Sequence, residues 1–231
     1  HYSEHLEELV EERTRELKKA QERLLQAERL AAIGEVAAMV GHDLRNPLTG
    51  IAGATYYLRT KIGPKMDEKA KKMVQLIEKD VEHSNKIIND LQDYSREIRL
   101  ERVETTPKSI MTEALFLVEV PENIQIIDAT RSEPKINVDV EKMKRVFVNI
   151  IKNAIDAMPE GGRLTIKSNE TGGNLEVAFT DTGTGIPQDT LEKIWTPLFT
   201  TKEKGMGLGL PICKRITEAH GGSISVKSSL G

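Results

Sequence analysis

The sequence predicts an α part followed by an α/β part: a dimeric helical hairpin with an N-terminal coiled coil, then an α/β sandwich with a mixed sheet. Before about residue 100 the chain is rich in Glu, Lys, Arg, Leu and Ala, and after Pro107 short Val-, Ile- and Thr-rich segments alternate with helical ones. With 231 residues the chain is long enough for two ordinary domains. We expect a coiled-coil helix over 1–30, a hairpin domain over 31–102 and the sandwich over 103–231.

The composition excludes several classes of protein. A hydrophobic fraction of 38% with 30% charged residues is typical of globular domains, and no run of about 18 apolar residues could span a membrane. The net charge is −3 with both signs mixed, so neither nucleic acid nor a membrane surface is an expected partner. With Cys213 as the only cysteine, a zinc cluster or disulfide framework is excluded, and a cytoplasmic location fits. Because the chain begins with His1 and not Met, we expect a fragment, whose full-length protein could be membrane-anchored.

A seven-residue repeat predicts the coiled coil, within a helical pattern that runs from Ser3 to about Thr60. The repeat comprises Val10, Leu17, Leu24 and Ala31 on one line and Leu6, Ala20 and Ala27 on a companion line. Arg13 interrupts the companion line, where a polar residue can set register at some cost in stability. A solvated single helix is the alternative.

A helical hairpin follows. Ile62-Gly63-Pro64 breaks the first helix, and a second one is predicted from Met66 to about Leu100 by apolar residues at spacings of three and four. Two helices with a short connection form an antiparallel hairpin, whose apolar stripe needs a partner. We therefore expect a homodimeric four-helix bundle.

Beyond Pro107 helices and strands do not alternate strictly, which favours a mixed sheet. The predicted elements are helices 108–119, 140–158, 188–194 and 208–220 and strands 123–129, 135–138, 162–169, 174–181 and 222–228.

The first helix carries a candidate nucleophile, His42. A neutral imidazole nitrogen is a good nucleophile near pH 7, and a carboxylate such as that of Asp43 can orient it or accept its proton. Successive side chains on a helix diverge by about 100°, so Asp43 must lean round to reach the ring. Asn46 lies one turn along the same face, and Pro47 predicts a bend beside His42. Taken alone, a histidine on a helix is more often structural than chemical.

Two asparagines begin a candidate nucleotide site. Asn149 and Asn153 are four residues apart on an otherwise apolar helix, so both amides fall on one face. Amide oxygens suit a magnesium ion that keeps its waters and phosphate ligands, and Asn153 is the expected metal ligand. Asp156 lies one turn beyond Asn153, and Lys152 can offer a charge to phosphate. The alternative is that the asparagines cap or bridge a buried helix.

A first glycine-containing turn follows the strand predicted over 174–181. Asp181 ends that strand, and Gly183 and Gly185 allow the close approach of a flat ligand. A carboxylate there suits the exocyclic amine of adenine, and Ile186 supplies apolar contact. Guanine would present a carbonyl instead.

A second glycine-rich segment contains Gly205, Gly207 and Gly209. Through Leu208 it leads into a helix with Pro211 in its first turn, where free N–H groups and the helix dipole attract phosphate. One such segment is weak evidence for a nucleotide site. Two in this order, behind an Asn-x-x-x-Asn helix, are much stronger.

Between the two glycine-rich segments, residues 197–204 have the composition of a mobile lid. Phe199 is the expected anchor of this lid segment, and Lys202 an expected phosphate contact.

Together these motifs resemble the catalytic core of sensor histidine kinases of two-component signalling. The resemblance covers about residue 30 to the end, and implies an ATP-binding domain of the Bergerat ATPase type. By it, 1–30 is a signalling helix, 31–102 a dimerisation and histidine phosphotransfer domain, and 103–231 the catalytic ATP-binding domain.

The resemblance also implies residue roles. His42 stands at the position of the phosphoacceptor, Asp43 at that of the general base, and Asn46 at that which places water for dephosphorylating the partner. The matching nucleotide positions are Asn149 and Asn153, then Asp181, Gly183 and Gly185, then Phe199, Thr200, Thr201 and Lys202, then Gly205, Gly207 and Gly209.

The chain departs from the family pattern in several places. Asp43 replaces the commoner Glu and Asn46 the commoner Thr, while Trp195 and Leu198 stand where phenylalanines are usual. The family's terminal glycine-threonine segment is absent, so the last sheet edge is expected to be incomplete.

The activity that the resemblance implies is autophosphorylation of His42 from ATP and magnesium, then transfer to an aspartate of a response regulator, with phosphatase activity toward it. Two alternatives remain. A Bergerat-type ATPase clamp would need a general base where Asn149 stands. A catalytically silent dimeric scaffold would not need Asp181 with both glycine-rich segments.

Overall fold

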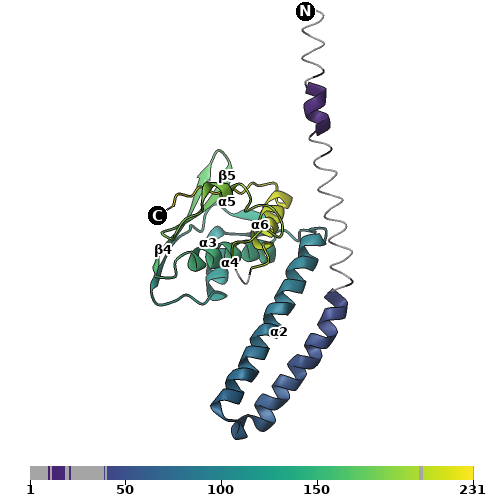
Figure 1. The fold of residues 1–231 in the computed structure, drawn as a ribbon. Coiled ribbons are helices and arrows are strands. Elements are labelled where there is room, and N and C mark those ends of the chain that lie inside the picture. Colours follow the sequence, from purple (N-terminus) through teal and green to yellow (C-terminus); the bar gives the residue numbers. More distant parts are fainter. Residues whose placement is uncertain are drawn as a thin grey trace, which may run out of the picture. The chain divides into compact units, whose positions relative to one another are not determined.

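The computed structural model describes residues 10, 12–18, 21, 39, 41–202 and 205–230 (Figure 1). The chain divides into two compact units, residues 1–96 and 97–231. Most of the predicted coiled coil lies outside the described residues and stays a prediction. None of the helices formed by the described residues combines the length and the hydropathy needed to cross a bilayer.

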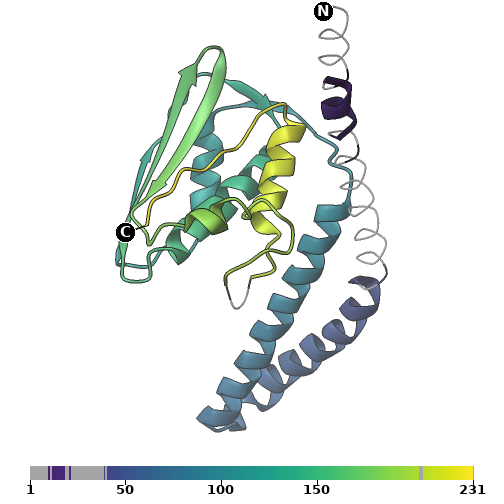
Figure 2. The same ribbon diagram turned by 45° about the horizontal axis from the view of Figure 1, so that its top comes forward.

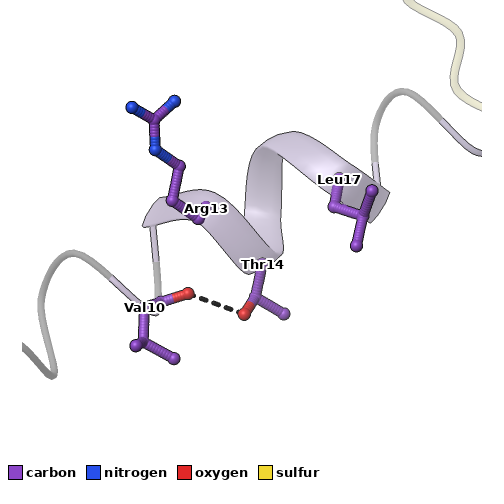
Figure 3. Close-up of a pocket in the computed structure, with 4 residues that line it drawn as sticks. All are labelled: Val10, Arg13, Thr14 and Leu17. Atoms are coloured by element: carbon purple, nitrogen blue, oxygen red, sulfur yellow. Dashed lines mark hydrogen bonds between the residues drawn. The ribbon is translucent and has the colours of Figure 1, made fainter.

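The described part of the N-terminal helix carries two residues of the predicted seam. Val10 and Leu17 are 59% and 60% exposed, and line a small surface pocket with Arg13 and Thr14 (Figure 3). Figure 3 shows these four residues on consecutive turns, with the side chain of Arg13 directed away from Val10 and Thr14. Arg13 forms an exposed ion pair with Glu16 at 2.8 Å. The pocket therefore lies on the predicted seam.

The predicted helical hairpin is confirmed in the first unit. Residues 41–57 are α-helical, and the chain continues through a π-turn, η1 (Leu58–Ile62), and a 3-10 turn, η2 (Gly63–Lys65). Helix α2 (Glu68–Ser95) then returns beside the first helix (Figure 1). Asp67 caps α2 because its side chain accepts the Ala70 N–H at 2.7 Å. The helix ends five residues before the predicted Leu100, at an extended Arg96.

Apolar side chains of the hairpin fall into two sets. Val74, Val81 and Ile88 repeat every seven residues along α2 and are buried within the single chain. A second set is 41–49% exposed; it comprises Leu44, Ile51, Met73, Leu76 and Ile77. The hairpin thus leaves apolar surface on both helices that a single chain does not cover.

The second unit is an α/β sandwich, as predicted. Its elements are β1 (Val103–Thr105), α3 (Pro107–Phe116), β2 (Ile124–Ala129), β3 (Ile136–Val138), α4 (Val140–Asp156), β4 (Gly162–Thr171), β5 (Asn174–Asp181), α5 (Gln188–Leu191) and α6 (Gly209–Ala219). The main sheet has the order β2-β4-β5, with β2 parallel and β5 antiparallel to β4. Helices α3, α4 and α6 form a layer over one face of this sheet (Figure 2).

The core lies between the sheet and the helices. Strand β4 alternates, so that Leu164, Ile166 and Ser168 face inward and are buried. Phe147 of α4 packs edge-to-face on Phe179 of β5, with ring centroids 5.5 Å apart. This packing fixes α4, which carries Asn149 and Asn153, and the end of β5, which carries Asp181.

The structure departs from the sequence prediction at the C-terminal segment, at β1 and at α5. The strand predicted over 222–228 is wrong: in the described part of the chain, residues 222–230 pair with no neighbouring strand, although Ile224 and Val226 alternate as a strand would. Alternation predicts a face, but only a partner with free N–H and C=O groups makes a strand. The short β1 was missed because its ladder to β3 joins distant segments. Helix α5 ends at Leu191, and residues 192–195 continue as turns.

Candidate functional site

His42 lies on the helix of residues 41–57, with its side chain 77% exposed. Its Nδ1 is 3.1 Å from Asp43 Oδ1, so Asp43 does lean round to the ring. A carboxylate only accepts hydrogen bonds, and the contact favours the tautomer with the proton on Nδ1. The lone pair then lies on Nε2, the outer nitrogen. Asn46 is exposed one turn further on, and the helix continues through Pro47, where the predicted bend stays a prediction.

The polar face of α4 contacts the segments around the second glycine-rich segment. Asn149 Nδ2 donates to the Gly209 carbonyl at 3.1 Å. The Lys202 ammonium donates to Asn153 Oδ1 at 2.9 Å and pairs with Asp156 Oδ2 at 2.7 Å. The structure therefore brings Asn153 and Asp156 to Lys202 of the lid segment, and Asn149 to Gly209 at the start of α6. The three side chains share a face, as their helical spacing predicts.

The first glycine turn is fastened to the end of α4. Asp181 is exposed, and its Oδ1 accepts the Gly183 N–H at 2.9 Å. A Cβ at Gly183 would lie 2.6 Å from the Ala157 carbonyl oxygen, so only glycine fits there. Thr184 N–H donates to that same carbonyl at 3.0 Å. The turn thus packs against the end of α4, one residue beyond Asp156. At Gly183 the space that glycine leaves is filled by the Ala157 backbone of the same chain.

The second glycine-rich segment packs against the lid segment. Gly207 has φ +66°, and a Cβ there would overlap the backbone of Phe199. The Leu198 N–H donates to the Gly207 carbonyl at 3.1 Å, and Leu198 itself has φ 64°, an uncommon value for a residue with a side chain. A Cβ at Gly205 would lie 2.7 Å from Thr200 Oγ1. Lid segment and glycines thus form one tightly packed loop.

The other predicted positions lie around this loop. Leu208 is buried, with 1% exposed, and anchors the start of α6. Ile186 is half-buried, and its N–H donates to Ser228 Oγ at 2.9 Å. Lys152 and Thr201 are exposed.

The residues present fit a nucleotide with a magnesium ion. Helix α6 begins at Gly209 with no side-chain cap. Pro211 has no N–H and the Ile212 N–H donates to the Leu208 carbonyl, so the N–H groups suited to an anion are those of Gly209 and Leu210. Asn153 and Asp156 supply hard oxygen ligands, which here hold the cation of Lys202. Among the described residues no three His, Cys, Asp or Glu cluster as metal ligands.

One polar junction was missed in the sequence. Asp139 caps α4, since its Oδ1 accepts the Lys142 N–H at 3.0 Å, while its Oδ2 accepts the Glu101 N–H at 3.0 Å. The Asp139 N–H donates to His220 Nε2 at 3.0 Å, and His220 Nδ1 donates to the Ile216 carbonyl at 2.8 Å. An Asp directly before a helical pattern is the signal that could have identified the cap.

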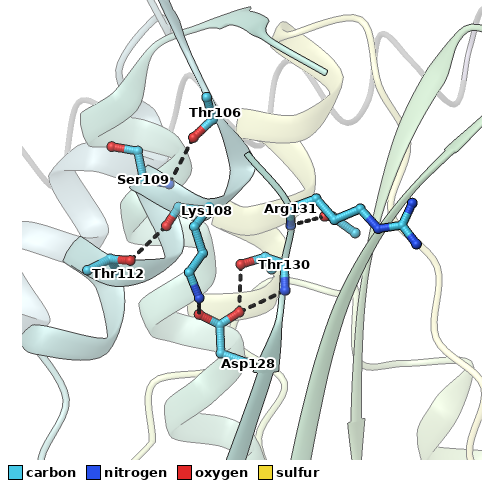
Figure 4. A network of polar contacts seen from close by, with 8 residues as sticks. Thr106, Lys108, Ser109, Thr112, Asp128, Thr130 and Arg131 are labelled. Atoms are coloured by element: carbon cyan, nitrogen blue, oxygen red, sulfur yellow. Dashed lines mark hydrogen bonds and ion pairs between the residues drawn. The ribbon is translucent and has the colours of Figure 1, made fainter. Parts of the chain in front are cut away.

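Two carboxylates of the sandwich, the buried Asp139 and the half-buried Asp128, have shifted pKa values. Burial alone would raise the pKa of Asp139, but hydrogen bonds from Lys142 and Glu101 outweigh it and lower the pKa below its ordinary 3.8. For Asp128 of β2, burial raises the pKa, but the hydrogen bonds from Lys108 and Thr130 outweigh burial and lower the pKa below its ordinary 3.8 (Figure 4). Figure 4 shows Lys108 reaching from α3 to Asp128, at 2.7 Å. Both groups are structural and lie outside the predicted nucleotide residues.

Two family models match the chain. The His Kinase A (phospho-acceptor) domain matches residues 32–98, and the histidine kinase-, DNA gyrase B- and HSP90-like ATPase matches residues 138–231. A phospho-acceptor hairpin followed by such an ATPase defines the class of histidine kinases. The chain belongs to the sensor histidine kinases of two-component systems.

Curated relatives agree with this family. The chain is 33% identical over 215 residues to the sensor histidine kinase ZraS of Escherichia coli K12, covering 91% of this chain and 46% of ZraS. It is 32% identical over 223 residues to sporulation kinase C of Bacillus subtilis 168, covering 94% and 51%. The chain thus spans about half the length of the curated relatives it matches.

Solved structures are similar as well. The histidine kinase ThkA, in a complex with the response regulator protein TrrA, matches at 31% identity with a TM-score of 0.60, over 90% of this chain and 61% of the solved one. Full-length ShkA in complex with AMPPNP matches at 24% identity with a TM-score of 0.74, over 86% and 43%. At that identity the likeness to ShkA shows the fold alone.

Proposed function

We propose that this chain is the catalytic core of a protein histidine kinase that phosphorylates itself on His42 and passes the phosphoryl group to an aspartate of a response regulator. The observation that carries the proposal is the contact of His42 Nδ1 with Asp43 at 3.1 Å, which leaves Nε2 outward on an exposed side chain. Membership of the sensor histidine kinases supports it.

In the proposed reaction His42 Nε2 is the nucleophile. Bound magnesium-ATP supplies a γ-phosphoryl group whose charge is partly neutralised. Nε2 donates its lone pair to phosphorus as the bond to the bridging oxygen breaks, and that electron pair leaves with ADP. Asp43 holds the Nδ1 proton and stabilises the positive charge that builds on the ring. The chain otherwise supplies positioning and charge.

The nucleotide residues have separate proposed roles. Asp181 accepts the adenine amine above the turn of Gly183 and Gly185, with Ile186 as apolar contact. The first turn of α6, after Gly205 and Gly207, binds phosphate together with Lys152 and Lys202. Asn153 is the metal ligand, with Asp156 beside it. Phe199, Leu208 and Gly209 shape the loop that carries Lys202 and the start of α6. Thr201 is assigned to the same nucleotide site from its place in the lid segment.

In the proposal, Asn149 keeps the hydrolysis of ATP by water slow. An amide cannot take a proton from water, so futile hydrolysis of ATP is slow. Its hydrogen bond to Gly209 meanwhile fixes the start of α6 to α4. An ATPase clamp would need a general base at this position.

The proposed partners are a second copy of this chain and a response-regulator receiver domain. The half-exposed apolar residues on both hairpin helices support a homodimeric bundle. The solved ThkA complex supports a response regulator, and Asn46 is the residue proposed to place water for its dephosphorylation. We assign 1–30 to a signalling helix, 31–102 to dimerisation and phosphotransfer, and 103–231 to ATP binding. A cytoplasmic location is proposed from ATP use and the single, reduced Cys213.

The test is labelling from γ-labelled ATP. We expect acid-labile, alkali-stable label in the wild type and none in His42→Ala, because the N–P bond forms only on that ring. His83→Ala is the matched control, a half-buried histidine on α2, and should keep its label. Label retained in His42→Ala would contradict the proposal. ATP hydrolysis without label would favour the clamp, and neither activity would favour the scaffold.

A further inference from the structure

A cross-hairpin clamp, which we define as Gly41, Arg45, Asn89 and Gln92, holds the helical turn that carries His42. The Arg45 guanidinium donates to Asn89 Oδ1 at 2.9 Å and to Gln92 Oε1 at 3.0 Å. The other end of the same Gln92 amide, Nε2, lies where a Cβ on Gly41 would overlap it. Gln92 therefore contacts the chain on both sides of His42.

Gly41 is the point of close approach. It is buried, and a Cβ there would also lie 3.0 Å from Ile88 Cγ2 of α2. The same helix contains Gly50 and Gly53, where a Cβ would meet nothing within 4 Å. Glycine weakens a helix relative to alanine, so a glycine at Gly41 needs a packing reason that the other two positions lack. At Gly41 the packing reason is the Gln92 amide, which occupies the space that a Cβ would need.

Because a helix has a fixed rotation per residue, the contacts of Gln92 with Gly41 and Arg45 determine the direction in which the His42 side chain points. At about 100° per residue, Gly41 and Arg45 are about 40° apart and both lie on the side toward α2. His42 is about 100° from Gly41 and about 60° from Arg45, so it lies to one side of the face that contacts α2, in keeping with its 77% exposure. Because the Gln92 amide contacts both Gly41 and Arg45, it fixes how this helical turn is rotated about the helix axis. The rotation of the turn then sets the direction of the His42 imidazole.

We propose that Gln92, acting through Gly41 and Arg45, is a positioning residue for phosphorylation of His42. It sets the rotation of the His42 turn, so that the ring is presented in one direction with Asp43 within reach. The inference rests on the proposed function, because it takes His42 as the phosphoacceptor. Gln92 and Arg45 touch no reacting atom in this role.

The experiment measures the maximal autophosphorylation rate at saturating ATP and the KM for ATP, with melting temperature as a check of folding. We expect Gln92→Ala and Gln92→Met to lower the maximal rate about ten-fold, because a misplaced nucleophile loses rate and not nucleotide affinity. The KM should stay within about two-fold. Gln92→Glu keeps an acceptor for Arg45 and should restore most of the rate.

Gly41→Ala tests the second contact. Its Cβ displaces the Gln92 amide, so we expect a similar loss, and the Gly41→Ala, Gln92→Ala double variant should lose no more than either single one. Gly50→Ala and Gln75→Ala are matched controls on the same two helices and should stay within about two-fold of the wild type.

The outcomes separate this inference from the proposed function. A wild type without label on His42 would overturn both. A labelled wild type with full rates in Gln92→Met and Gly41→Ala would overturn the clamp alone. Loss of rate in Gln92→Met that Gln92→Glu does not restore, or a change confined to KM or melting temperature, would assign Gln92 a purely structural role and also overturn it.

Discussion

The ammonium group of Lys202 lies between two oxygens of α4, those of Asn153 and Asp156. Such oxygens are the ligands that a magnesium ion uses, so a cation from the lid segment stands among them here. Lys202 and Asp156 are 47% and 56% exposed, which limits the contribution of their ion pair to about 1 kcal/mol. One modest contact thus fastens the lid segment to α4.

We expect Lys202→Ala to speed amide hydrogen exchange in residues 197–202 of the nucleotide-free protein by up to about five-fold, since about 1 kcal/mol of closing energy is lost. Lys193→Ala is the control, an exposed lysine on the preceding turn. The measurement is exchange followed by mass spectrometry. Equal exchange in both variants would show that Lys202 does not fasten the segment.

Asp181→Asn should weaken the binding of ATP about ten-fold or more, because a charged acceptor is replaced by a neutral one at Gly183 and at the proposed contact with the adenine amine. Titration calorimetry with a non-hydrolysable ATP analogue measures this. Asp189→Asn, on the exposed first turn of α5, should bind like the wild type. Unchanged affinity in Asp181→Asn would remove Asp181 from the adenine site.

For individual residues, helical spacing in the sequence predicted which side chains of α4 lie together in the candidate site. Asn149, Asn153 and Asp156 share a face because a helix repeats every 3.6 residues, and they contact the lid segment and α6 together. The clamp was not predictable, since Arg45 and Gln92 are 47 positions apart and pair only once the hairpin has formed.

Among the elements, the loop that joins the lid segment to α6 depends on one glycine. Gly207 has φ +66° and its missing Cβ leaves room for the Phe199 backbone. Gly172, in the turn between β4 and β5, has φ +59°, and a Cβ there would meet nothing within 4 Å. Both glycines have a left-handed backbone conformation, but only Gly207 is packed against another segment.

Gly207→Ala should therefore weaken ATP binding much more than Gly172→Ala. Both variants carry a left-handed alanine, at a cost of about 1 kcal/mol, but only Gly207→Ala must also move the lid segment. Calorimetry with an ATP analogue and the melting temperature of each variant separate the two effects. Similar ATP affinity in the two variants would mean that the packing on Phe199 does not shape the nucleotide site.

The elements themselves show what a sequence pattern can and cannot predict. Helix α4 and strands β4 and β5 were predicted to within two residues, because their apolar periodicity matches what they bury. Residues 222–228 have the periodicity of a strand and no strand partner among the described residues. Strand formation is a property of two segments, so one segment's pattern does not decide it.

For the whole molecule, the pH dependence of stability follows from Asp128 and Asp139. Their folded-state pKa values lie below the ordinary 3.8, so both favour the folded state above that pH. We expect the free energy of unfolding of the sandwich to fall as the pH drops from about 4 through the lower folded-state values. Denaturant titrations at a series of pH values measure it.

In Asp128→Asn the acid part of this dependence should be shallower, because one of the two linked protonations is gone. The neutral-pH stability should also fall by about 1–3 kcal/mol, since Lys108 and Thr130 lose a charged acceptor. A variant whose acid limb is as steep as that of the wild type would exclude Asp128 as a source of the pH dependence.

The Asp139 carboxylate links two parts of the sandwich through its two oxygens. One oxygen starts α4, and the other holds the backbone of Glu101 in the stretch that leads into the sandwich. A mechanical pull on the chain ahead of Glu101 would therefore be delivered to the first turn of the helix that bears Asn149 and Asn153. The stretch that leads into the sandwich and the helix that carries the proposed nucleotide ligands share this one anchor, through which tension on the preceding chain would reach the proposed nucleotide site.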